Sequence, residues 1–71
     1  MKIKFGISYN KLWKMLIDRK MKKKDLRAAT HLSPAVIAKM GRDEPVSLET
    51  LALICRVLGC RLDDIVEINP V

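Results

Sequence analysis

The sequence has few of the side chains on which catalytic and metal sites are built. His31 is its single histidine, and Cys55 and Cys60 are its two cysteines. A zinc site with four protein ligands needs more Cys or His residues than these, so we expect no bound metal. There is also no glycine-rich phosphate loop, and no pair of carboxylates is placed to flank a cleft. We therefore expect neither an enzyme with catalytic residues nor a protein with a cofactor.

Long apolar runs and a signal-peptide pattern are also missing. We therefore expect a soluble cytoplasmic protein with no membrane partner. In a reducing compartment, Cys55 and Cys60 are best interpreted as small buried hydrophobic residues. Aromatic residues number three, and the single tryptophan, Trp13, lies within an apolar stripe. We expect Trp13 in the core rather than on a base-stacking surface.

Acidic residues are scarce in the first part of the chain. Residues 1–42 contain twelve Lys and Arg against Asp18 and Asp25, a net charge of +10. Residues 43–71 contain two Arg against six Asp and Glu, a net charge of −4. Such a separation is typical of a face that binds phosphates. The alternative, an ordinary solvated surface, would more often mix the two signs.

Length and composition predict one small globular domain over residues 1–71. Apolar residues make up 49% of the 71 residues and charged residues 31%, a composition that favours a folded chain. A core of this size is marginally stable by itself. We therefore expect a homodimer.

Apolar spacing predicts helices on both sides of a central helix pair. The first runs from a Ser8 cap to about Lys20, and the fourth from a Ser47 cap to a stop at Gly59. Their predicted buried stripes are Tyr9, Leu12, Trp13, Leu16 and Ile17, and Leu48, Leu51, Ile54, Cys55 and Leu58.

The two ends of the chain each allow two interpretations. Residues 1–5 alternate polar and apolar side chains, which predicts a short strand or a basic arm, and Gly6 is expected to end it. Residues 62–68 predict a fifth short helix with Leu62, Ile65 and Val66 inward. The alternation from Val66 onward allows an extended segment instead.

The central pair, about residues 22–42, is a helix-turn-helix pattern. In its first helix Leu26 and Ala29 are predicted to face inward, and residues 30–32 form the turn. Ser33 is a good N-cap and Pro34 suits the first helical position. Val36, Ile37 and Met40 recur at helical spacing, and Gly41 is predicted to end the helix with positive φ.

From residue 9 to residue 68 the chain resembles the lambda-repressor/Cro-like (Xre-type) helix-turn-helix regulators, and their short single-domain members most of all. The matching segments are Asn-Lys-Leu-Trp (10–13), Asp-Leu-Arg-Ala-Ala-Thr-His-Leu-Ser (25–33), Val-Ile-Ala-Lys-Met-Gly (36–41), Val-Ser-Leu-Glu-Thr-Leu (46–51) and Leu-Asp-Asp-Ile (62–65). Arg27 stands where the family prefers Ala, and His31 where it prefers Gly. His31 is therefore expected to adopt a left-handed conformation.

The resemblance implies an all-α, compact five-helix DNA-binding domain, to which a short N-terminal strand can be added. It also implies sequence-specific binding of double-stranded DNA by a transcriptional regulator, and we expect a repressor. In the family the third helix enters the major groove. The DNA-binding residues carried over are Lys23, Lys24, Arg27, Ser33, Pro34, Ala35, Ala38, Lys39 and Arg42.

These residues have different expected roles. Lys23 and Lys24 match positions that touch the DNA backbone, and Arg27 can orient the recognition helix or reach a phosphate. Ala35 and Ala38 offer methyl contacts to thymine, or are ordinary helix-surface residues. The helix lacks Arg, Asn and Gln side chains for bidentate base contacts, so phosphates are expected to supply much of the affinity.

Apolar residues near both chain ends suggest a dimer interface. The candidates are Ile3, Phe5, Ile65, Ile68 and Val71. The alternative is that these ends pack on their own domain. A second functional hypothesis is a protein-interaction module, antitoxin-like or an anti-repressor, that uses the apolar surface of the third helix.

Overall fold

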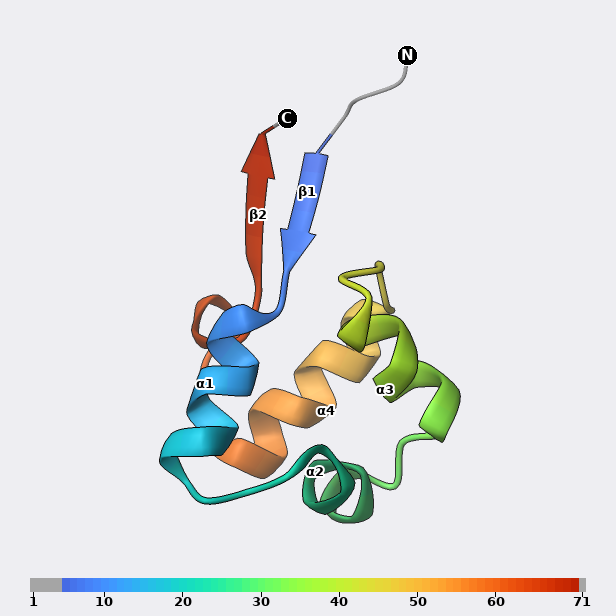
Figure 1. The fold of residues 1–71 in the computed structure, drawn as a ribbon, viewed down its shortest axis with the longest axis vertical. Coiled ribbons are helices and arrows are strands. Elements are labelled where there is room, and N and C mark those ends of the chain that lie inside the picture. Colours follow the sequence, from blue (N-terminus) through green and yellow to red (C-terminus); the bar gives the residue numbers. More distant parts are fainter. Residues whose placement is uncertain (1–4, 71) are drawn as a thin grey trace.

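A computed structural model of the chain describes residues 5–70. Over these residues the chain forms four α-helices, one 3-10 turn and two strands, arranged as a helical body with a projecting two-stranded ribbon (Figure 1). In chain order the elements are β1 (Phe5–Ser8), α1 (Asn10–Asp18), α2 (Lys23–Thr30), α3 (Pro34–Gly41), α4 (Leu48–Leu58), η1 (Leu62–Asp64) and β2 (Glu67–Pro70).

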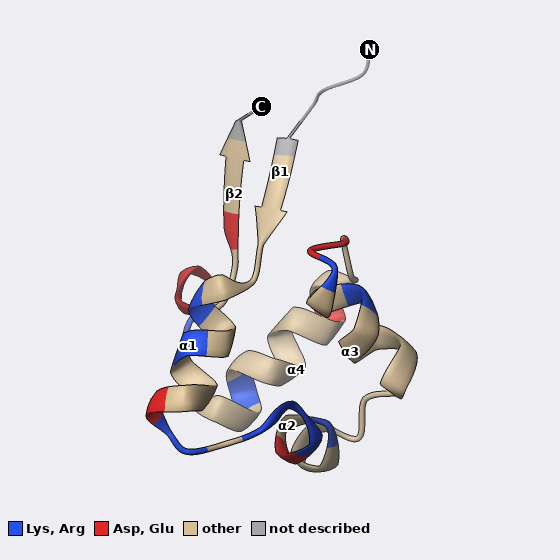
Figure 2. Cartoon of the chain, in the orientation of Figure 1, with Lys and Arg blue, Asp and Glu red and all other residues tan. Residues whose placement is uncertain are grey.

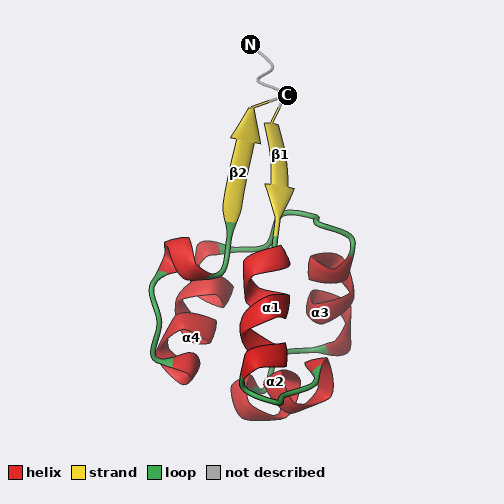
Figure 3. Cartoon of the chain, turned by 60° about the vertical axis from the view of Figure 1, so that its left-hand side comes forward, coloured by secondary structure: helices red, strands yellow, loops and turns green. Residues whose placement is uncertain are grey.

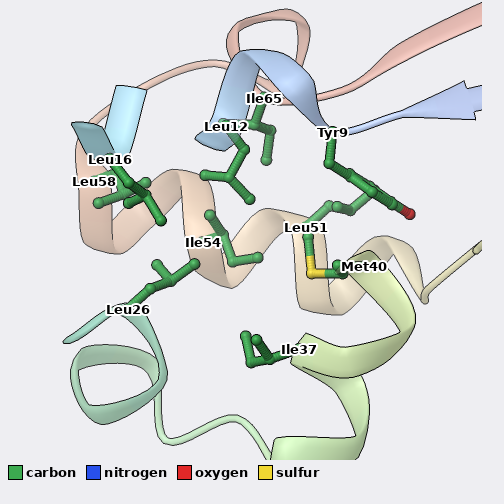
Figure 4. Packing of buried hydrophobic residues seen from close by; sticks show 10 residues of the cluster. All are labelled: Tyr9, Leu12, Leu16, Leu26, Ile37, Met40, Leu51, Ile54, Leu58 and Ile65. Carbon is green, nitrogen blue, oxygen red and sulfur yellow. The ribbon is translucent and has the colours of Figure 1, made fainter. Parts of the chain in front are cut away.

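The helices pack around α4. Figure 4 shows Ile54 of α4 between side chains from α1 on one side and Leu26 of α2 on the other. The ten buried apolar residues are Tyr9, Leu12, Leu16, Leu26, Ile37, Met40, Leu51, Ile54, Leu58 and Ile65. Each full burial is worth about 1.5–3 kcal/mol before entropy is counted. This shared core fixes how α2 and α3 lie relative to each other.

Helix α1 is shorter than predicted. Ser8 belongs to β1, although its Oγ accepts a hydrogen bond from the Asn10 N–H at 3.2 Å, and the helix ends at Asp18. The prediction that Ile17 is buried is wrong, because its side chain is 73% exposed. The chain reverses at Lys20, where φ is 57°, and Met21 packs against the core after this reversal.

The rest of the predicted α1 stripe faces the core. Tyr9, Leu12 and Leu16 are buried, while Trp13 is half-buried and packs against them. Trp13 therefore has one part of its ring in the core and another part at the surface.

Helix α4 has the predicted caps. Ser47 Oγ accepts a hydrogen bond from the Thr50 N–H at 3.1 Å, and Gly59 ends the helix with φ at 66°. Leu48 is 68% exposed, so its predicted burial is wrong. It is the first residue of the helix, one turn before the buried Leu51, and its side chain extends beyond the core.

The predicted fifth helix is wrong, and so is the five-helix count. Residues 62–64 form one 3-10 turn, and the extended alternative applies from residue 67 onward as β2. Of the three residues expected inward, Ile65 is buried, Val66 is half-buried and Leu62 is exposed.

Strand β2 pairs antiparallel with β1, with Ile7 opposite Ile68 and Ser8 opposite Glu67. Gly6 was expected to end the N-terminal strand, yet it lies inside β1 opposite Asn69. The ladder hydrogen bonds to the distant β2 hold this glycine extended, although glycine by itself weakens a strand. The described strand covers residues 5–8, and residues 1–4 of the predicted strand or basic arm lie outside the described residues.

The dimer candidates have different environments. Ile68 lies on β2 and is 67% exposed, whereas Ile65 is fully buried in the core of its own chain. Ile3 and Val71 lie outside the described residues, as does the side chain of Phe5. Ile68 is thus the candidate with described surface to offer a partner.

Cys55 and Cys60 are free thiols, and both are half-buried. Within residues 5–70, no three or more His, Cys, Asp or Glu side chains are grouped so that they could hold a metal ion. None of the described helices has the length and apolar character needed to cross a membrane.

Candidate nucleic-acid interface

The turn between α2 and α3 depends on Thr30 and His31. Thr30 is buried, and its hydroxyl donates a hydrogen bond to the Leu26 carbonyl at 2.8 Å. The same oxygen accepts a hydrogen bond from the Leu32 N–H at 3.4 Å. His31 ends α2 in the left-handed region, at φ 59° and ψ 23°, as predicted. Ala29 was predicted to be buried but is exposed, because Thr30 takes the inward position at the end of α2.

Helix α3 begins as the sequence predicted. Ser33 Oγ accepts a hydrogen bond from the Val36 N–H at 3.3 Å, and Pro34 follows at the first helical position. Ile37 and Met40 face the core. The exposed residues of α3 are Pro34, Ala35, Ala38, Lys39 and Gly41.

The end of α3 differs from the prediction. Gly41 is the last residue of the helix, and the positive φ falls two residues later at Asp43, at 55°. Asp43 Oδ1 accepts a hydrogen bond from the Tyr9 N–H at 3.2 Å, and the Tyr9 hydroxyl donates to the Glu44 carbonyl at 2.8 Å. These two hydrogen bonds connect the loop after α3 to the start of α1. Asp43, whose positive φ is strained, is thus held by a tertiary contact with Tyr9.

Arg42 is already paired. Its Nε donates to Glu44 Oε2, and this hydrogen bond lowers the pKa of the Glu44 carboxyl and raises the pKa of Arg42. The pair is exposed to solvent, so it is individually weak. Glu44 nevertheless stays ionised at neutral pH, and Arg42 has an intramolecular alternative to any phosphate.

A hollow of about 270 Å³ lies between α2 and α3. Cations from α2 form one side of it, and apolar atoms from α3 form the other. The lining residues are Lys23, Lys24, Arg27, Pro34, Ile37, Ala38 and Gly41. Five of the nine predicted DNA-binding residues thus share one hollow. The other four, Ser33, Ala35, Lys39 and Arg42, lie on α3 or at its ends outside the hollow.

The start of α2 concentrates positive charge. Lys22, Lys23 and Lys24 are all exposed there, where the helix dipole is itself positive. The Asp25 carboxylate accepts a hydrogen bond from the Lys22 N–H at 2.7 Å and partly offsets that charge. A helix N-terminus with adjacent lysines suits an anion such as phosphate.

Lys23 makes a contact that the sequence did not indicate. Its Nζ lies 4.3 Å from the centre of the Trp13 ring, a cation–π distance. The two residues are ten positions apart on different helices, so no local spacing rule connects them. The half-buried state of Trp13 leaves one ring face available for this contact.

Some cations of residues 1–42 are hydrogen-bonded to backbone carbonyls far from the hollow in the sequence. Arg19 Nη1 donates to the Leu58 carbonyl at the end of α4 at 2.6 Å. Lys11 Nζ donates to the Asp63 carbonyl at 3.2 Å. The net charge of residues 1–42 therefore overstates the charge available at the hollow.

Most positive and negative side chains lie on different parts of the folded chain. Figure 2 shows positive charge along the α1–α2 connection and the start of α2, and negative charge on η1, on β2 and in the loop after α3. Asp25 is the acidic residue within α2. The hollow thus opens on the basic part of the described surface.

Comparison with known proteins agrees with this geometry. Residues 11–70 match the sequence model of the Cro/C1-type HTH DNA-binding domain. The crystal structure of the transcriptional regulator VanUg, Form II, is 48% identical to the chain and superposes with a TM-score of 0.92. That alignment covers 100% of this chain and 93% of the other. No curated protein matches the chain.

Proposed function

Because the chain belongs to the Cro/C1-type HTH DNA-binding domain family, we propose that it is a transcriptional repressor that recognises specific sites on double-stranded DNA. The observation that carries the proposal is the hollow between α2 and α3, with three cations on one side and residues along α3 on the other. Repression would follow from occupation of the operator, which blocks access to the promoter.

The phosphate contacts in this proposal come from Lys23, Lys24 and Arg27. All three are exposed and line the hollow between α2 and α3. Lys23 and Lys24 lie at the start of α2, and Arg27 lies in its last turn. Each neutralised phosphate contributes about −0.9 to the slope of log K against log salt concentration. Three contacts thus give a slope of about −2.7. Arg42 contributes less, because Glu44 already pairs with it.

Sequence reading in this proposal comes from α3. Ser33 and Lys39 carry the polar groups that can reach base edges, while Ala35 and Ala38 offer methyl contacts to thymine. Pro34 shapes the start of the helix. Since this set includes no bidentate reader of guanine or adenine, DNA shape and half-site spacing supply further specificity.

The proposed active form is a homodimer joined through the ribbon. The ribbon projects from the body, and Ile68 on β2 is largely exposed. A single module of this size buries about 600–1,000 Å² on DNA, so two half-sites increase affinity considerably. Figure 3 shows both strands extending beyond the ends of the helices, where a second copy has room to pair.

A second candidate function is protein binding through α3. Pro34, Ala35 and Ala38 form an exposed apolar surface, which a partner helix could cover. Such binding relies on apolar contact rather than on the lysines of α2. Charge reversal at the start of α2 therefore separates the two functions.

The test is a salt series of binding to random duplex DNA, using the parent chain and Lys23→Glu/Lys24→Glu. We expect the double variant to bind at least ten-fold more weakly and its salt slope to fall to about −0.9. The matched control is Arg56→Glu/Arg61→Glu, which makes the same change of net charge at residues outside α2 and α3. Equal losses in both double variants, or no loss in either, would contradict the proposed phosphate site.

A further inference from the structure

We propose that Trp13 is a positioning residue that holds the Lys23 ammonium ready for a DNA phosphate. The juxtaposition behind this proposal is the 4.3 Å approach of Lys23 Nζ to the Trp13 ring centre. The proposal rests on the phosphate-binding function proposed for Lys23. It adds that α1, through its tryptophan, takes part in DNA binding without touching the DNA.

The backbone directs the Lys23 side chain toward α1. Lys23 is the first residue of α2, and side chains in helices lean toward the helix N-terminus. Lys23 lines a second hollow of about 210 Å³, together with Trp13, Leu16, Ile17 and Met21. Its ammonium lies over the Trp13 ring, at the edge of this apolar hollow.

The end of α3 borders the same ammonium. A Cβ atom added at Gly41 would lie 3.4 Å from Lys23 Nζ, so the ammonium lies next to the last turn of α3. Carbonyl groups at a helix C-terminus carry partial negative charge, which favours a cation. Groups from α1 and α3 thus border one lysine head group.

Holding the ammonium in place favours phosphate binding. A free lysine loses rotamer freedom when it engages a phosphate, and this loss weakens binding. The contacts with Trp13 and the end of α3 restrict that freedom in the unbound protein, so less of it is lost on binding. The contact of the ammonium with the ring face still leaves N–H donors for phosphate oxygens, because an ammonium has three.

The test is a double-mutant cycle on affinity for random duplex DNA. It uses the parent chain, Trp13→Leu, Lys23→Met, and the variant with both changes. An exposed cation–π contact of ordinary strength predicts that Trp13→Leu binds about two- to five-fold more weakly. If Trp13 acts through Lys23, adding Trp13→Leu to Lys23→Met causes no further loss.

A matched background separates positioning from a general loss of structure. Trp13→Leu in a Lys24→Met background is expected to cause the same two- to five-fold loss as in the parent chain. A purely structural role for Trp13 would weaken binding by the same factor in all three backgrounds. That result would overturn the positioning role and leave the phosphate-binding proposal intact.

The single lysine variants distinguish failure of the proposed phosphate site from failure of the positioning role. If neither Lys23→Met nor Lys24→Met weakens binding, the phosphate site itself is wrong, and the role of Trp13 in DNA binding fails with it. If Lys23→Met weakens binding while the cycle is additive, the positioning role alone fails.

A measurement without DNA guards against misfolding of the leucine variant. Stacking on the ring predicts upfield NMR shifts of the Lys23 ε-methylene protons in the unbound chain. Trp13→Phe keeps an aromatic face and is expected to keep these shifts and most of the affinity. Ordinary lysine shifts in the parent chain would overturn the proposal.

Discussion

Tyr9 is the residue that connects α1 to the loop after α3. Its backbone N–H reaches the Asp43 carboxylate and its hydroxyl donates to the Glu44 carbonyl, while the ring is buried in the core. Burial, and to a lesser degree the Asp43 charge, raise the pKa of the Tyr9 phenol above its usual value of 10.0. The folded chain therefore favours the neutral phenol.

We expect Tyr9→Phe to lower the free energy of unfolding by about 1 kcal/mol, because the Glu44 carbonyl loses its partner. Because the pKa of Tyr9 is raised on folding, its contribution is complete below the unfolded pKa and is lost as pH rises through the folded value. The fall in stability above about pH 10 is thus expected to be steeper in the parent chain than in Tyr9→Phe. Urea unfolding at neutral and alkaline pH measures both effects, and parallel pH profiles would contradict the assignment.

At the scale of elements, the turn between α2 and α3 depends on one left-handed residue. His31 takes φ 59° without the freedom of glycine. We expect His31→Val to lower the free energy of unfolding by about 1–2 kcal/mol, because a β-branched residue is strongly disfavoured there. His31→Gly is expected to stay within about 1 kcal/mol of the parent chain, since the strain it relieves is opposed by a more flexible unfolded chain. Thermal unfolding compares the two variants, and equal losses would show that φ at residue 31 does not limit stability.

Local signals were sufficient for the helix boundaries that depend on caps. Ser33, Ser47 and Gly59 perform their predicted roles, because each acts on amides or carbonyls within a few residues along the chain. The segment after residue 62 was different. Residues 67–70 are a strand because they pair with β1, about sixty residues earlier in the chain, and no local pattern identifies that partner.

The candidate site was predictable to a similar extent. Lys23, Lys24 and Arg27 were identified from charge and resemblance, and they do share a hollow with Pro34 and Ala38. The contact between Trp13 and Lys23 was not predictable, because it depends on how α1 is rotated against α2. The ion pair of Arg42 depends likewise on the path of the loop after α3.

At the scale of the whole molecule, the ribbon offers a surface for a second copy. We expect the parent chain to show a concentration-dependent monomer–dimer equilibrium in sedimentation experiments and Ile68→Lys to remain monomeric, since a charge would replace the exposed apolar side chain of β2. Ile17→Lys is the matched control, because Ile17 is exposed to a similar degree but lies on α1. Dimerisation of Ile68→Lys at the parent's affinity would exclude the ribbon as the interface.

The pairing of β1 with β2 also constrains the order of folding. Each helix and its caps use contacts within a short stretch of chain, whereas the ribbon joins the two ends of the described chain, with all four helices between them (Figure 1). Closing a loop of that length costs entropy that helix formation does not incur. During synthesis on the ribosome, β1 emerges before the four helices and β2 emerges after them. The helical body can therefore assemble before the ribbon closes, and we expect ribbon closure to follow helix packing.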